Sequence, residues 1–128
     1  MRLLLDTHAF IWWLTDDPSL SRAAHAAIGD PESSVFVSAA AAWEIATKFR
    51  IGKLPKHAVI AEDVGGWIGR MGFGELPVSV AHGQLAGALP GPHKDPFDRM
   101  LMAQAMAERM VLVSNETLFD AYGVKRLW

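Results

Sequence analysis

Short apolar runs alternate along this chain with longer stretches in which apolar and polar residues are mixed. The first run is Leu3–Leu5, and three consecutive leucines are typical of a strand buried on both faces. Comparable runs predict further strands at residues 34–38, 74–79, 111–114 and 124–128. The mixed stretches predict helices at residues 9–14, 19–30, 39–53, 57–72, 79–89 and 96–110, and a short helix or turn at 115–123. Alternating strands and helices indicate an α/β fold with a parallel sheet covered on both faces.

Residues that start or stop helices support these boundaries. Ser38 is available as the N-cap of the alanine-rich segment that follows it, and Pro96 stands at the first helical position of its segment. Gly29 and Pro31 mark the end of the helix before the second strand. The glycines in segment 57–72 weaken its helical character, although one helix is still expected there.

The size and composition of the chain fit one domain, residues 1–128. The chain is 51% hydrophobic and includes five tryptophans, which suits a single well-formed core. The absence of cysteine excludes a disulfide scaffold and a zinc site built from thiolates, and it fits a reducing cytoplasm. We expect neither a signal peptide nor a membrane span. Because the net charge is −2, any attraction for nucleic acid must come from a local basic patch or from metal ions.

Acidic residues follow strands or open helices in this predicted fold. Asp6 and Glu116 come after the first and fourth strands, so both are expected at the carboxyl edge of the sheet, where open α/β sheets bind ligands. Glu44 lies in the first half of the helix after the second strand. Asp95 and Asp98 open the helix before the fourth strand. Converging carboxylates repel one another, and hard oxygen ligands favour Mg²⁺ or Mn²⁺ as the ion that relieves this repulsion.

Each of these acids also has an ordinary structural explanation. Asp6 and Asp95 could each cap the helix that follows. Glu44 precedes Lys48 by one helical turn and could form an ion pair with it, and Glu116 could lie on an exposed turn. No single acid distinguishes a ligand from a structural residue, and only their joint placement suggests a metal site.

Four segments together resemble a known family. They are LLLDTHAFIWWL (3–14), AAAAWEIATKFRIGKL (39–54), HKDPFDRMLMAQA (93–105) and LVSNETLFDAYGV (112–124). In this order they resemble the PIN-domain family, and more narrowly the VapC-type ribonuclease toxins of bacterial toxin–antitoxin pairs. The resemblance covers nearly the whole chain and implies a three-layer α/β/α sandwich with a central parallel sheet. It also implies an endoribonuclease dependent on Mg²⁺ or Mn²⁺, which hydrolyses RNA to 5′-phosphate and 3′-hydroxyl ends.

The resemblance assigns site residues by their place in the motifs. Its first three acids correspond to Asp6, Glu44 and Asp98. Asp95 is then a neighbour of the ligand Asp98, a direct ligand of the metal, or the cap of the helix that follows. The fourth acid of the family normally follows a T-x-D pattern after the last central strand, where this chain has Ser114 and Glu116. The serine keeps the hydroxyl and the glutamate keeps the charge, but the longer side chain of Glu116 makes it the least secure ligand.

Further residues acquire roles from the same interpretation. Thr7 and Ser114 could orient water or a carboxylate. Lys94 and Arg99 could contact the scissile phosphate, or Arg99 could form a salt bridge to Asp95. A basic group that could follow an RNA backbone comprises Lys48, Arg50, Lys53 and Lys56. The resemblance also implies a cognate VapB-type antitoxin and a homodimer, with the early helices contributing to both interfaces.

Two other functions remain open from the sequence. A PIN-fold binding module with weak or no catalysis would explain the altered residues Ser114 and Glu116. A metal-dependent phosphatase would use Asp6 as a covalent nucleophile. That chemistry usually requires a second acid two residues later, where this chain has His8, so the sequence disfavours it.

Overall fold

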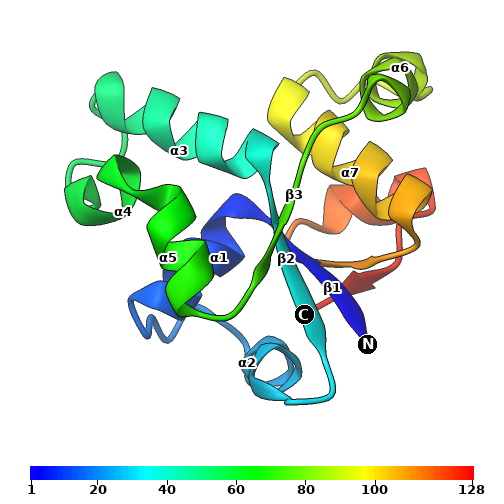
Figure 1. The fold of residues 1–128 in the computed structure, drawn as a ribbon. Coiled ribbons are helices and arrows are strands. Elements are labelled where there is room, and N and C mark those ends of the chain that lie inside the picture. Colours follow the sequence, from blue (N-terminus) through cyan, green and yellow to red (C-terminus); the bar gives the residue numbers. More distant parts are fainter.

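A five-stranded parallel sheet forms the centre of the computed structural model, which describes residues 1–128 (Figure 1). The strands are β1 (Arg2–Leu5), β2 (Ser34–Ser38), β3 (Gly74–Leu76), β4 (Val111–Val113) and β5 (Arg126–Leu127). Their order across the sheet is β3-β2-β1-β4-β5, and all neighbouring strands are parallel. Leu5 stands in register with Val37 of β2 and Val113 of β4. The carboxyl end of β1 therefore lies at the middle of the sheet edge, and the predicted α/β fold is confirmed.

The side chains of β1 alternate between two apolar layers. Leu3 and Leu5 are buried on one face of the sheet, and Leu4 is buried on the other. The first face is covered by α1 (Thr7–Leu14), α2 (Arg22–Gly29), α3 (Ala39–Arg50), α4 (Ala58–Glu62) and α5 (Val64–Arg70). The second face is covered by α6 (Val80–Ala88), α7 (Pro96–Glu108) and the 3₁₀ helix η1 (Thr117–Tyr122). The expected three-layer α/β/α sandwich is therefore present, and Figure 1 shows α6 and α7 on the opposite side of the sheet from α1 and α5.

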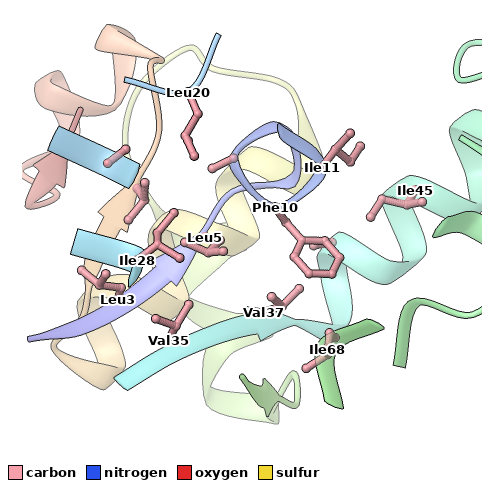
Figure 2. Close-up of a cluster of buried hydrophobic side chains, with 14 of the residues drawn as sticks. Leu3, Leu5, Phe10, Ile11, Leu20, Ile28, Val35, Val37, Ile45 and Ile68 are labelled. Carbon is pink, nitrogen blue, oxygen red and sulfur yellow. The ribbon is translucent and has the colours of Figure 1, made fainter. Parts of the chain in front are cut away.

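The first apolar layer fixes α1 and α3 beside the end of β1. Figure 2 shows Phe10 of α1 in one cluster with Leu5, Val37 and Ile45, and all four side chains are fully buried. Each large apolar side chain contributes roughly 1.5–3 kcal/mol when it is fully removed from water. The residues that immediately follow β1 and β2 are consequently held in a rigid part of the molecule.

Several boundaries differ from those predicted by the sequence. The single helix expected at 57–72 is two helices, because Asp63 leaves the helical conformation (φ −153°) and its carboxylate caps α5 at the N–H of Gly66, 3.0 Å away. The third strand ends at Leu76 instead of continuing to 79, since Pro77 has no N–H for the sheet. The second helix begins only after its cap, Ser21. None of the helices is long and apolar enough to cross a membrane.

Candidate active site

Asp6 lies directly after the central strand and is fixed by both its backbone and its side chain. Its N–H donates to the carbonyl of Val113 at 3.1 Å, which extends the pairing of β1 and β4 by one residue. Its Oδ1 accepts from the N–H of Ala9 at 2.8 Å, so Asp6 is the N-cap of α1. The side chain is 8% exposed, and burial raises its pKa, while hydrogen bonds from Ser114 and Ala9 act in the opposite direction. Asp6 is therefore a helix cap and a buried carboxylate at once.

Glu44 is buried on α3 with both carboxylate oxygens engaged. The Thr7 hydroxyl donates to Oε1, and the Lys48 ammonium donates to Oε2. The predicted ion pair with Lys48 is therefore present, but it is not an ordinary surface pair, because Glu44 is only 4% exposed. The first residue of α1 and one face of α3 are joined through this carboxylate.

Asp95 and Asp98 have different partners at the start of α7. Oδ1 of Asp95 accepts from the N–H groups of Phe97 (2.9 Å) and Asp98 (3.1 Å), which makes Asp95 the N-cap. Oδ2 of Asp98 lies 2.8 Å from Nε2 of His93. Of the roles considered for Asp95, capping is present in the structure. The sequence carries no signal for the contact of His93, because five residues separate it from Asp98 across a loop and a helix start.

Helix packing brings these acids to one region of the molecule, since α3 packs against both α1 and α7. Burial is the main reason that the pKa of Asp98 is raised, and the charges of Asp95 and Glu44 raise it further, whereas the hydrogen bond with His93 lowers it. The charge of Asp98 in turn raises the pKa of Asp6. The start of α7 therefore faces the ends of β1 and α3, which the sequence alone left undetermined.

The donor chemistry of this edge fits a divalent cation. Neighbouring carboxylates repel one another and are stabilised by positive charge, and Mg²⁺ and Mn²⁺ prefer oxygen ligands. No group of three His, Asp or Glu side chains is already gathered closely enough to hold an ion. The partners described above account for this, because Glu44 is turned toward Thr7 and Lys48, and Asp98 is turned toward His93.

The sequence profile of the PIN domain matches residues 3–125. The chain belongs to the PIN-domain family. Among curated proteins, it is similar to Ribonuclease VapC16 of Mycobacterium tuberculosis (strain ATCC 25618 / H37Rv), with 42% identity over 57 residues. That match covers 44% of this chain and 40% of the relative, so it spans less than half of either protein.

Solved structures share the fold of this PIN domain over nearly its whole length. VapBC2 from Rickettsia felis, bound to a DNA fragment from its promoter, gives a TM-score of 0.73 at 15% identity and covers 99% of this chain and 98% of that one. VapBC-1 from nontypeable Haemophilus influenzae gives 0.66 at 13% identity, covering 99% and 97%. FitAcB from Neisseria gonorrhoeae gives 0.63 at 20% identity, covering 98% and 96%.

The fourth acid of this PIN domain is turned back toward its own chain. Oε1 of Glu116 accepts from the N–H of Leu118 at 3.1 Å and so caps η1. The N–H of Glu116 donates to Oγ of Ser114 at 3.0 Å. Ser114 is fully buried, and its hydroxyl lowers the pKa of the Asp6 carboxyl. Glu116 follows β4 at the expected edge, and its role as a ligand remains a prediction.

Arg99 does not form the salt bridge to Asp95 that was one of its two predicted roles. Its guanidinium donates to the carbonyl oxygens of Ala86 (3.0 Å), His93 (2.9 Å) and Leu89. It forms no salt bridge with Asp95, and three of its five N–H groups are used within the protein, while its contact with a phosphate remains a prediction. Arg99 ties the connection between α6 and α7 to α7 itself. Lys94 is exposed on that connection, and its contact with phosphate remains a prediction.

An apolar groove is lined by Trp43 and Phe97, which are the sequence neighbours of Glu44 and Asp98. Trp43 precedes Glu44, Phe97 precedes Asp98, and their rings meet edge to face with centroids 4.8 Å apart. The groove has a volume of about 430 Å³ and is bounded by residues of α3, α6 and α7. Trp43 is 63% exposed, an unusual position for so large an apolar side chain. Exposed apolar surface of this kind is typical of places where partners bind.

Proposed function

We propose that this PIN domain is a metal-dependent endoribonuclease that serves as the toxin of a toxin–antitoxin pair. The observation that carries the proposal is the convergence of Asp6, Glu44 and Asp98, from three separate segments, on the carboxyl edge of a parallel sheet. The relative named Ribonuclease VapC16 supports the activity. The neighbour described as a toxin–antitoxin complex from Klebsiella pneumoniae supports the biological role.

Asp6, Glu44 and Asp98 would hold Mg²⁺ or Mn²⁺, with Asp95 and Glu116 at the border of the site. A bound ion supplies activation of water and stabilisation of the negative charge on the attacked phosphate. The protein requires no nucleophilic side chain in this chemistry. Three exposed basic residues beyond Glu44 would contact the RNA backbone: Arg50, Lys53 and Lys56.

The surrounding residues orient the carboxylates. Thr7 holds Oε1 of Glu44, and Ser114 and the N–H of Ala9 hold the side chain of Asp6. His93 holds one oxygen of Asp98, which leaves the other for a ligand. Partners of this kind fix ligand geometry in metal sites, and their removal typically lowers affinity or activity by about 10–100-fold.

A VapB-type antitoxin and a second copy of the chain complete the proposal. The structural neighbours named as VapBC and toxin–antitoxin complexes support the antitoxin. The exposed Trp43, close to the acids, supports a protein partner on this face. We expect the protein to act in the cytoplasm, where its RNA substrate is found.

The deciding experiment is cleavage of total cellular RNA by the purified, antitoxin-free protein, with Mg²⁺, with Mn²⁺ and with EDTA. The comparison includes Asp6→Asn, which removes a charge at the site, and Asp30→Asn, which removes an exposed charge at the end of α2. We expect cuts at a few discrete positions with the wild type and Asp30→Asn, and none with EDTA or Asp6→Asn. Wild-type cleavage by Asp6→Asn would overturn the proposal, and folded protein that binds RNA without cutting it would indicate a binding module.

A further inference from the structure

Lys48 is the one lysine or arginine side chain that forms an ion pair with Asp6, Glu44 or Asp98. Its ammonium lies against Oε2 of Glu44, one helical turn away on α3. The carboxylate is buried, whereas the Lys48 side chain is 28% exposed. The pair therefore has one fixed, desolvated partner and one partner that reaches out to solvent.

The two partners of Glu44 differ in how they would respond to a divalent cation. Thr7 is a neutral donor, and since a carboxylate oxygen has two lone pairs, its hydrogen bond to Oε1 is compatible with an ion on the same group. The Lys48 ammonium carries a positive charge, and two cations on one carboxylate repel each other strongly at contact distance. Thr7 can remain in place when Glu44 becomes a ligand, whereas Lys48 has to leave.

A counter-charge also stabilises a buried carboxylate such as that of Glu44. An unpaired charge in the interior is strongly destabilising. The side chain of Lys48 is a flexible four-carbon stem that can turn outward without moving α3, and its exposed part already lies toward solvent. The same residue can thus neutralise Glu44 in the metal-free protein and withdraw when an ion arrives.

We propose that Lys48 is a built-in counter-ion for Glu44 that a divalent cation must displace, so that Lys48 sets the metal concentration at which the site forms. This inference rests on the proposed function only in taking Glu44 as a metal ligand. It makes Lys48 a positioning residue, which holds Glu44 buried and ready in the metal-free state. It also explains why no three acids are gathered for an ion, since Glu44 is held toward Lys48 instead.

The test is Mn²⁺ and Mg²⁺ binding by isothermal titration calorimetry, which needs no RNA. Lys48→Met keeps the stem of the side chain and removes the competing charge, so its metal affinity should rise at least about tenfold. Arg50→Met is the matched control, because it removes an exposed positive charge from the same helix without a contact to Glu44. In a Glu44→Gln background, Lys48→Met should raise the metal affinity no more than Arg50→Met does.

Lys48→Arg covers the case in which Lys48→Met does not fold without metal. A guanidinium pairs with a carboxylate through two hydrogen bonds, so this variant keeps Glu44 neutralised and should bind Mn²⁺ several-fold more weakly than the wild type. Equal metal affinities for wild type, Lys48→Arg and Lys48→Met would overturn the inference, as would an absence of binding by all three. Normal metal binding without RNA cleavage would instead overturn the proposed function and leave the role of Lys48 standing.

Discussion

The Thr7 hydroxyl donates a hydrogen bond to Oε1 of Glu44 and so connects the first residue of α1 to the middle of α3. Because Thr7 follows Asp6 directly, the backbone that presents one acid also holds the other. Thr7→Val keeps the shape of the side chain and removes the hydroxyl, which leaves a buried oxygen without its donor. We expect it to cost about 1–3 kcal/mol of stability and to lower RNA cleavage roughly 10–100-fold. Thr7→Ser, which restores the hydroxyl, should recover most of both in urea unfolding and cleavage assays.

Substitution by Asn should affect RNA cleavage differently at Asp95 and Asp98, the two aspartates at the start of α7. Asp98→Asn removes a charge that faces Asp6 and Glu44, and we expect at least about 100-fold slower cleavage with little loss of stability. Asp95→Asn keeps a good capping residue, so cleavage should fall far less. Asp95→Ala should cost about 1 kcal/mol through loss of the cap. Equal loss of cleavage in the two Asn variants would show that Asp95 is itself a ligand.

The stability of the metal-free protein should decrease as the pH rises above the ordinary aspartate pKa of 3.8. The pKa values of Asp6 and Asp98 are raised above the ordinary value of 3.8, so the folded state holds these protons more tightly than the unfolded state. The free energy of unfolding then falls as the pH rises through the raised values. In EDTA, Asp98→Asn should melt a few degrees above the wild type at pH 7, and the difference should shrink toward pH 4.

Asp120 provides the opposite control for that pH dependence. Its hydrogen bonds with Arg126 lower its pKa, so its contribution to stability is present above the ordinary value of 3.8 and is lost only in acid. Asp120→Asn should therefore melt at or below the wild-type temperature at pH 7. A higher melting temperature in both variants would indicate a general effect of net charge instead of repulsion within the site.

Glu116 should contribute less to catalysis than the three converging acids. Its Oε1 is used to cap η1, and its side chain is partly exposed. Glu116→Gln keeps the capping oxygen and removes the charge, and we expect a decrease in cleavage of about tenfold. Glu116→Asp shortens the side chain to the length that the family resemblance favours, and cleavage should be equal to or faster than that of the wild type. A complete loss in Glu116→Gln would identify Glu116 as an essential ligand.

Arg99 should be more important for local order than for RNA binding. Its donors hold carbonyl groups of Ala86, Leu89 and His93. Arg99→Met leaves these groups without that partner, and we expect a loss of about 2–3 kcal/mol together with faster hydrogen exchange in residues 89–95. Arg109→Met, which removes an exposed arginine after α7, should change neither. Normal exchange with a raised KM for RNA would instead assign Arg99 to the phosphate.

The fold was largely predictable because its signals are local. The leucines of β1, the cap Ser38 and the proline at position 96 each determine structure within a few residues of themselves. The break at Asp63 was not predicted, although Asp63 caps the second helix at the N–H of Gly66. A periodic pattern of apolar residues continues across residues 57–72 and does not show where a capping residue divides the segment.

The acidic residues of the candidate site could be predicted from the sequence, but their hydrogen-bond partners could not. Asp6 and Glu44 follow parallel strands, so the topology alone brings them to one edge. The contacts of Arg99 and His93 depend on the path of the α6–α7 connection, and no sequence pattern encodes that path. The orientation of Glu116 depends on a turn that competes for its carboxylate. Residue type and strand order determine which groups meet, whereas loop geometry determines what they bind.

The central position of β1 has a consequence for the protein during its synthesis. β1 is made well before its neighbour β4, which consists of Val111–Val113. The N–H of Asp6 has its acceptor, the carbonyl of Val113, only after that strand is made, and Asp98 is also contributed late. A chain still emerging from the ribosome therefore cannot assemble this edge. If the edge cuts RNA, the growing polypeptide is harmless to the ribosome that makes it until β4 has been made.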